Sequence, residues 1–150
     1  TSDEKLAQQR RKYIDILQKQ DIAEVTLGQT CRIILPDTVI FNAHSANLLS
    51  DQQDKLATVA DLIKTNSIVE VDVAGYADDR LPEAQSRALT QGQAQAVADY
   101  LRRANIDARL IAGQGYGQHN VVASNVTAQG KDFNRRVEVT FRVYPDRPMY

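Results

Sequence analysis

Alternating apolar and acidic residues near the middle of the chain predict its central strand. Residues 69–73 read Val-Glu-Val-Asp-Val, and this period of two places the three valines on one face of a half-buried strand. Gly75 then allows the backbone to turn, and Asp78 and Asp79 follow it. The pattern predicts a strand over residues 68–75 with two carboxylates in the loop after its carboxyl end.

These two carboxylates can be interpreted in two ways. Ligands tend to dock at the carboxyl ends of strands in α/β folds, which favours a binding role for Asp78 and Asp79. An aspartate between a strand and a helix also accepts hydrogen bonds from backbone N–H groups, as a cap or turn former. The second role is the commoner one, and the pattern alone favours it.

Apolar residues that recur every three or four positions predict helices over residues 3–20, about 51–64 and 82–104. Either Ser50 or Asp51 can cap the second helix, and Pro82 fits the first turn of the third. The residues expected on the buried face of the third helix are Leu89, Gly92, Ala94, Val97, Ala98 and Leu101.

Shorter apolar runs predict strands over residues 23–27, 31–35, 39–41, 109–114 and 135–143. The turn at Gly28 and Gln29 joins the first two as a hairpin, and residues 125–130 read as a polar loop. This order of elements predicts a two-layer α/β sandwich of the α+β kind, with a mixed β-sheet covered by two main helices. We expect an N-terminal helical arm over 1–22, one domain over 23–144 and a flexible tail over 145–150.

Composition excludes several classes of function. The chain has 150 residues, 43% of them hydrophobic and 25% charged, which suits one soluble domain with a single core. Its formal net charge of −1 lacks the basic footprint that nucleic-acid binding requires. No apolar run is long enough to span a membrane, so we expect membrane attachment only through a lipid anchor outside this chain. The single cysteine, Cys31, excludes an internal disulfide and reads as a small buried hydrophobe.

The sequence does not predict an enzyme. No nucleophile, base and orienting group occur in a recognisable set, and Ser45 beside His44 is a pair of loop neighbours that rarely act together. His44, His119, Asp78 and Asp79 lack the spacing of metal ligands. We therefore expect no catalytic residues, no metal and no cofactor.

One segment near the end of the chain carries a family resemblance. Residues 125–138 read N-V-T-A-Q-G-K-D-F-N-R-R-V-E, which resembles the N-x-T-x-x-G-R-x-x-N-R-R-V-E motif of OmpA-like domains, with Lys131 in place of an arginine. Residues 75–78, Gly-Tyr-Ala-Asp, stand where that family has G-H-T-D. Weaker similarity at 39–42 and 89–97 extends the resemblance over roughly residues 24–143.

The resemblance implies a non-catalytic module that binds the diaminopimelate of the peptidoglycan peptide stem. Such a module would anchor an outer-membrane protein or complex to the cell wall, on the periplasmic face of the outer membrane of Gram-negative bacteria. Asp78 then takes the ligand's ammonium, and the family's carboxylate-binding arginine corresponds to Gln93. Because glutamine has no charge and no planar fork, this change weakens carboxylate binding. Tyr76 and Ala77 replace the family's histidine and threonine, and Arg87 is a nearby substitute for the missing arginine.

Asn134 and Arg135, near the end of the motif, are also candidate peptidoglycan-binding residues, and the two arginines Arg135 and Arg136 can be interpreted in two ways. One of the arginines contacts the ligand carboxylate, or one pairs with an acidic residue such as Asp78 or Asp72 inside the fold. The internal pair is favoured because paired arginines and carboxylates are common in structures. Asn134 is expected to form a turn at the strand entrance.

A second function fits the altered site residues. The chain could be a structural subunit of an envelope-spanning secretion complex that contacts other proteins of the envelope. The G-Y-A-D-D segment at 75–79 resembles OmpA-like lipoproteins of Dot/Icm-type (type IVB) secretion outer-membrane complexes. A degenerate peptidoglycan pocket is what this hypothesis expects.

Overall fold

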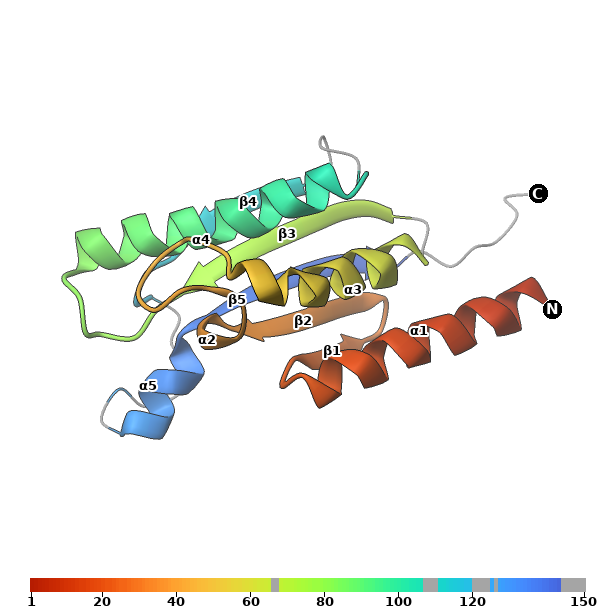
Figure 1. Ribbon diagram of the computed structural model, residues 1–150, viewed down its shortest axis with the longest axis horizontal. Coiled ribbons are helices and arrows are strands. Elements are labelled where there is room, and N and C mark those ends of the chain that lie inside the picture. The colour runs from red at the N-terminus through yellow and green to blue at the C-terminus, as the bar shows by residue number, and fades with distance from the viewer. Residues whose placement is uncertain (66–67, 107–110, 120–124, 126, 144–150) are drawn as a thin grey trace.

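A five-stranded sheet with helices packed over one face forms the molecule (Figure 1). The computed structural model describes residues 1–65, 68–106, 111–119, 125 and 127–143. The strands are β1 (Ala23–Leu27), β2 (Thr30–Pro36), β3 (Ile68–Tyr76), β4 (Ile111–Gly115) and β5 (Arg136–Val143). The helices are α1 (Ser2–Lys19), α2 (Asp37–Ile40), η1 (Ser50–Gln52), α3 (Gln53–Lys64), α4 (Glu83–Arg103) and α5 (Ala128–Asn134).

The strand order is β1-β2-β5-β3-β4, and β4 alone is parallel to its neighbour. The last strand of the chain therefore lies at the centre of the sheet, between β2 and β3. Val137, Val139 and Phe141 of β5 and Val71 and Val73 of β3 point into the core, as their alternation predicts. The predicted two-layer sandwich with a mixed sheet is confirmed.

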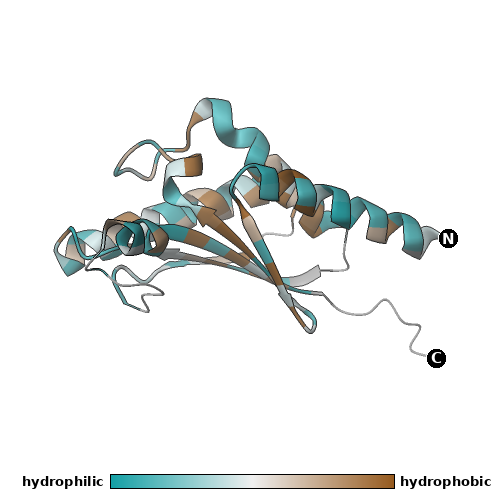
Figure 2. Cartoon of the chain, turned by 90° about the horizontal axis from the view of Figure 1, so that it is seen from below, coloured by the Kyte–Doolittle hydropathy of each residue, from teal (hydrophilic) through white to brown (hydrophobic). Residues whose placement is uncertain are grey.

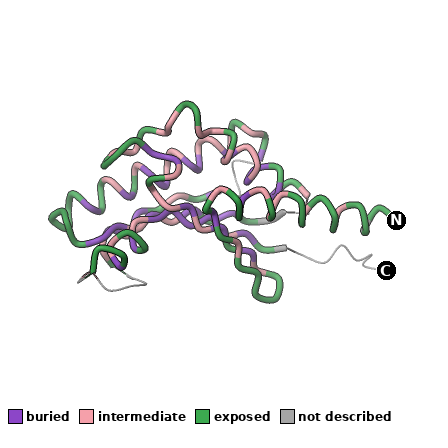
Figure 3. The backbone as a smooth tube through the Cα atoms, turned by 60° about the horizontal axis from the view of Figure 1, so that its bottom comes forward, coloured by how far each residue is buried: buried purple, intermediate pink, exposed green. Residues whose placement is uncertain are grey.

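Buried residues gather between the helices and the sheet (Figure 3). The helix α1 begins in a capping box between Thr1 and Glu4 and sends Leu17 into this core. Arg10 donates to the Thr65 carbonyl across 3.0 Å, which ties α1 to the end of α3. The first half of α1 extends past the sheet and is mostly hydrophilic (Figure 2). No helix among the described residues is long and apolar enough to cross a membrane.

Two predictions of local structure were wrong. Residues 39–41 were expected to form a strand because they are β-branched or aromatic, yet 37–40 form the short helix α2. Pro36 ends β2 with φ −58° and directs the chain into this turn, and only Phe41 makes an isolated bridge, to Leu48. The second error lies in the predicted polar loop 125–130, because α5 begins at Ala128 after the Thr127 side chain caps Gly130 N at 2.9 Å.

The buried face of α4 is more polar than the sequence pattern suggests. Ala94, Val97, Ala98 and Leu101 are buried as expected. Leu89 and Gly92 are only half-buried, while three polar residues, Ser86, Thr90 and Gln93, are buried on the same helix. The predicted cap of the second helix also differs, because Ser50 and Asp51 lie in η1 and α3 begins at Gln53.

The helix α4 approaches β3 and β4 closely where the strands carry glycine. A Cβ atom at Gly115 would lie 2.1 Å from the Gln91 backbone nitrogen, and one at Gly75 would lie 2.4 Å from the Thr90 carbonyl oxygen. The side chain of Gln91 bridges the same strand, since its amide donates to Gly113 O at 3.1 Å and accepts from Gly115 N at 2.8 Å. The close contact of this helix with the sheet depends on glycine at both positions.

We predict that Gly115→Ala lowers the free energy of unfolding by about 2 kcal/mol or more, because the added methyl group meets helix backbone that cannot move aside. Gly75→Ala should cost less than Gly115→Ala. Gly113→Ala should cost least, since its Cβ would lie 3.2 Å from the nearest atom. Urea denaturation of the three variants measures this order, and three equal losses would contradict it.

Candidate functional site

The candidate site lies where the loop after β3 meets the segment between α5 and β5. The loop is fixed to the segment that follows β4, because Ala77 N donates to Gly117 O at 2.7 Å. The side chain of Asp78 is 5% exposed, although it lies in a loop. Ala77 is buried with it, so both residues belong to the packed end of the sheet.

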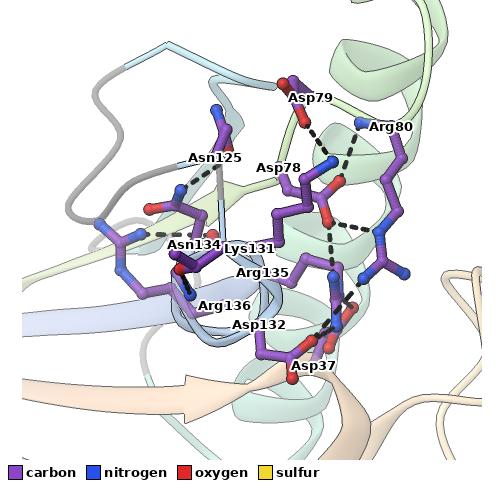
Figure 4. Close-up of polar contacts among 12 residues, drawn as sticks. Asp37, Asp78, Asp79, Arg80, Asn125, Lys131, Asp132, Asn134, Arg135 and Arg136 are labelled. Atoms are coloured by element: carbon purple, nitrogen blue, oxygen red, sulfur yellow. Dashed lines mark hydrogen bonds and ion pairs between the residues drawn. The ribbon is translucent and has the colours of Figure 1, made fainter.

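Five charged residues form what we call the Arg135 cluster: Asp37, Asp78, Arg80, Asp132 and Arg135 (Figure 4). All three nitrogens of the Arg135 guanidinium face carboxylates. Nη1 donates to Asp78 Oδ2 at 2.5 Å, Nη2 contacts Asp132, and Nε lies 3.7 Å from Asp37 Oδ2. The cluster thus joins α2, the loop after β3 and α5 through one side chain that is 15% exposed.

Arg80 makes the second contact with Asp78. Its Nε lies 3.0 Å from Asp78 Oδ2, and its backbone N–H donates to Asp78 Oδ1 at 3.1 Å. The neighbouring Asp79 turns away and pairs with Lys131 Nζ at 3.1 Å. Asp78 is therefore a turn former, as one interpretation of the sequence held, and it also forms ion pairs with two guanidinium groups.

Burial and charge act in opposite directions on the ionisable groups of the cluster. Burial raises the pKa of Asp37 above its ordinary value, and the positive charge of Arg135 only partly offsets this. Burial lowers the pKa of Arg135, but hydrogen bonds to Asp78 and Asp132 and the charge of Asp37 raise it overall. Three carboxylates against two guanidinium groups leave the cluster one negative charge, which suits a positively charged ligand group.

Tyr76 and Arg136 lie on the face of the sheet that points away from the core and the helices. The Tyr76 ring stacks on Tyr116 with a centroid distance of 5.5 Å, and the Arg136 guanidinium lies 4.2 Å above Tyr76. Arg136 Nε also pairs with Glu138 at 2.6 Å, and both side chains are less than 10% exposed. Burial and the charge of Glu138 raise the pKa of Tyr76. Arg136 therefore forms an internal pair, and so does Arg135, as the sequence favoured, the latter with Asp78.

Gln93 is turned to an internal partner. Its side-chain amide donates to the Ser45 carbonyl at 3.1 Å, and the residue is 2% exposed. At the preceding Gly92 a Cβ would meet the Ala46 methyl at 3.0 Å, so the loop containing Ser45 packs tightly on α4. Gln93 thus fixes this loop to the helix.

Arg87 and Asn134 make contacts of their own. The Arg87 guanidinium pairs with Glu83 at 3.0 Å on the exposed side of α4, and both line a groove beside β4. Asn134 is buried at the end of α5, where its amide donates to Asn125 Oδ1 at 2.9 Å. Of the residues named from the sequence, the structure joins Asp78 and Arg135 directly, while Gln93, Arg87, Tyr76 and Asn134 engage other partners.

Sequence reasoning missed Asp37, Arg80 and Asp132. Asp132 and Arg135 are three residues apart, which is a pairing distance on a helix, but the helix itself was not predicted. Arg80 follows Asp78 by two residues and could have been noticed as a cation beside the proposed ligand residue. A pocket of about 370 Å³ adjoins the cluster, lined by Ile34, Pro36, Asp37, Thr38, Gln129, Asp132, Phe133, Arg135 and Arg136. The described residues contain no group of three potential metal ligands.

Comparison with known proteins identifies the family. A model of the OmpA family matches residues 40–135. The chain belongs to the OmpA family. One curated relative is the probable lipoprotein YiaD of Escherichia coli K12, which is 34% identical over 132 residues. The match covers 88% of this chain and 60% of YiaD.

A second curated relative and a solved structure also match this chain. The peptidoglycan-binding protein ArfA of Mycobacterium tuberculosis is 35% identical over 67% of this chain and 31% of its own length. Among solved structures, the cell wall anchor of the T6SS from Pseudomonas aeruginosa superimposes with a TM-score of 0.81 at 27% identity, covering 89% of this chain and 96% of that one. The chain thus spans only part of its curated relatives but nearly all of this solved domain.

We predict that Asp37→Asn stabilises the protein at pH 7. Burial raises the pKa of Asp37 in the folded state above that in the unfolded chain. Its ionisation therefore lowers the free energy of unfolding as the pH rises from the unfolded-state pKa, and the full cost is present above the folded-state pKa. The neutral amide removes this cost, and the gain should shrink as the pH falls from 7 towards 4 and the wild-type carboxyl takes up a proton. Urea denaturation at each pH measures the difference.

Asp132→Asn is the matched control, because Asp132 contacts the same arginine but is 64% exposed. Its effect at pH 7 should stay below about 0.5 kcal/mol. Destabilisation by Asp37→Asn at pH 7 would show instead that the pair with Arg135 outweighs burial.

Proposed function

We propose that this chain is a non-catalytic peptidoglycan-binding module that anchors an outer-membrane protein or complex to the Gram-negative cell wall. The observation that carries the proposal is the position of Asp78, a buried carboxylate at the carboxyl end of β3 in a chain of the OmpA family. The names of ArfA and of the cell wall anchor support the same role, since they describe attachment to peptidoglycan or the cell wall.

The ligand we propose is the diaminopimelate side chain of the peptide stem, held without covalent chemistry. Its free end carries an ammonium and a carboxylate, and the ammonium binds Asp78. The net negative charge of the Arg135 cluster favours that group over an anion. Arg135 acts by positioning Asp78, because its own nitrogens all face protein carboxylates.

The setting follows from the same proposal. The module occupies residues 23–144, the arm over 1–22 leads into it, and both lie in the periplasm against the inner side of the outer membrane. A lipid anchor outside this chain holds the protein to that membrane, in line with the lipoprotein named among its relatives.

We predict that the purified protein co-sediments with diaminopimelate-type sacculi and that Asp78→Asn reduces the bound fraction at least tenfold. The amide keeps the shape of the side chain but loses the charge that pairs with the ammonium. Asp72→Asn is the matched control, since Asp72 is an exposed carboxylate on β3, the strand that precedes the loop containing Asp78. Circular dichroism establishes that each variant is folded, and equal sedimentation of all three folded proteins would exclude Asp78 as a ligand residue.

A second candidate function is favoured by Gln93. The residue at the family's arginine position is buried and committed to the Ser45 carbonyl, so it offers nothing to a ligand in this conformation. In this alternative the chain is a structural subunit of an envelope-spanning secretion complex, of the Dot/Icm type, and acts through contacts with other envelope proteins.

Substitution of Gln93 distinguishes the two candidates. We expect Gln93→Arg to increase the fraction bound to sacculi, because a guanidinium restores a planar fork for the ligand carboxylate. Gln93→Ala controls for loss of the contact with Ser45, since it frees the loop without adding charge. If neither the wild type nor Gln93→Arg sediments, the structural role becomes the better explanation.

A further inference from the structure

Arg80 differs from the other cations near Asp78 in how much of its hydrogen-bonding capacity is in use. Arg135 directs all three nitrogens at carboxylates, Lys131 pairs with Asp79, and Arg136 is 4% exposed beside Glu138. Arg80 is 42% exposed and uses only Nε at hydrogen-bond distance. Its Nη2 lies 3.8 Å from Asp132, and Nη1 has no partner among the described residues.

These unused donors lie beside Asp78, the residue that we propose binds the ligand ammonium. Figure 4 shows the Arg80 guanidinium lying against Asp78 with Nη1 pointing away from the cluster. The two terminal nitrogens of a guanidinium form a planar fork that matches a carboxylate. A zwitterion whose ammonium reaches Asp78 would bring its own carboxylate next to this fork.

We propose that Arg80 binds the ligand carboxylate in place of the arginine that Gln93 replaces, so that the ligand inserts into the Asp78–Arg80 ion pair. This inference rests on the proposed peptidoglycan-binding function. Insertion exchanges one internal pair, at 3.0 Å, for two pairs with the ligand, the ammonium with Asp78 and the carboxylate with Arg80. Asp78 keeps its bond to Arg135 throughout, so no buried charge is left without a partner.

This arrangement selects for a zwitterion. A ligand with an ammonium alone could pair with Asp78 but would leave the displaced Arg80 with water as its partner. A ligand with a carboxylate alone would meet the net negative charge of the cluster. Specificity for diaminopimelate over lysine at the same position of the stem therefore depends on Arg80, since lysine lacks that second carboxylate.

The test compares two probes that differ by one carboxylate, L-Ala-γ-D-Glu-meso-diaminopimelate and L-Ala-γ-D-Glu-L-Lys, titrated calorimetrically into the full chain. Wild type should prefer the first. Arg80→Ala should weaken that binding roughly tenfold or more. It should not weaken binding of the lysine peptide, because the ammonium of that peptide no longer has to displace Arg80 from Asp78. Arg80→Lys should give an intermediate loss, because it keeps the charge without the fork.

Arg103→Ala is the matched control, an exposed arginine at the far end of α4, and it should bind both peptides as the wild type does. An equal loss of both peptides on Arg80→Ala would overturn the inference, because Arg80 would then act only by holding Asp78. Unchanged binding of both would overturn it as well, while leaving the proposed function intact. If wild type binds neither the peptides nor sacculi, the proposed function itself fails.

Discussion

The partly buried positive charge of Arg135 constrains this end of the molecule more than any other group. A guanidinium that is 15% exposed must be surrounded by acceptors, and here these come from three separate segments: α2, the loop after β3, and α5. The two helices among these segments are short: α2 has 4 residues and α5 has 7. Their positions are therefore set by electrostatics at the cluster as much as by apolar packing. The bond from Arg135 also holds Asp78 in place just after the carboxyl end of β3.

The rest of the site follows from how closely α4 lies on the sheet. Glycine at positions 75 and 115 lets the helix backbone approach the strands, and the polar residues Ser86, Thr90 and Gln93 become buried as a result. Each must then find a partner inside the protein. Thr90 accepts from Gly117 N at 3.0 Å, and Gln93 donates to the Ser45 carbonyl. A glutamine that would be a weak ligand on an open surface becomes a structural contact because of this packing.

The strands, the long helices and the two-layer arrangement could be predicted because each rests on a local period in the sequence. The short elements could not. Residues 39–41 have strand-forming side chains, but Val39 and Ile40 lie in the helix that follows Pro36, where Asp37 sits beside Arg135. The helix α5 was hidden because only Thr127, as its cap, signals it. Asp78 could be found from the family motif, and Arg80 could be noticed two residues after it. The sequence does not contain the exposure and the distances that set Arg80 apart from the other cations.

The side chain of Gln91 has a consequence for how copies of this protein meet one another. Its amide accepts from Gly115 N and donates to Gly113 O, which is the pattern that a single residue of a parallel neighbouring strand would make. At the β4 edge of the sheet, Gly113 O and Gly115 N are thus already bonded to a side chain of α4, and these two groups are not available to another chain. The other edge strand, β1, lies at the opposite side of the sheet and is not bonded by Gln91. A further strand would therefore have to displace the Gln91 side chain in order to pair with β4 at Gly113 and Gly115.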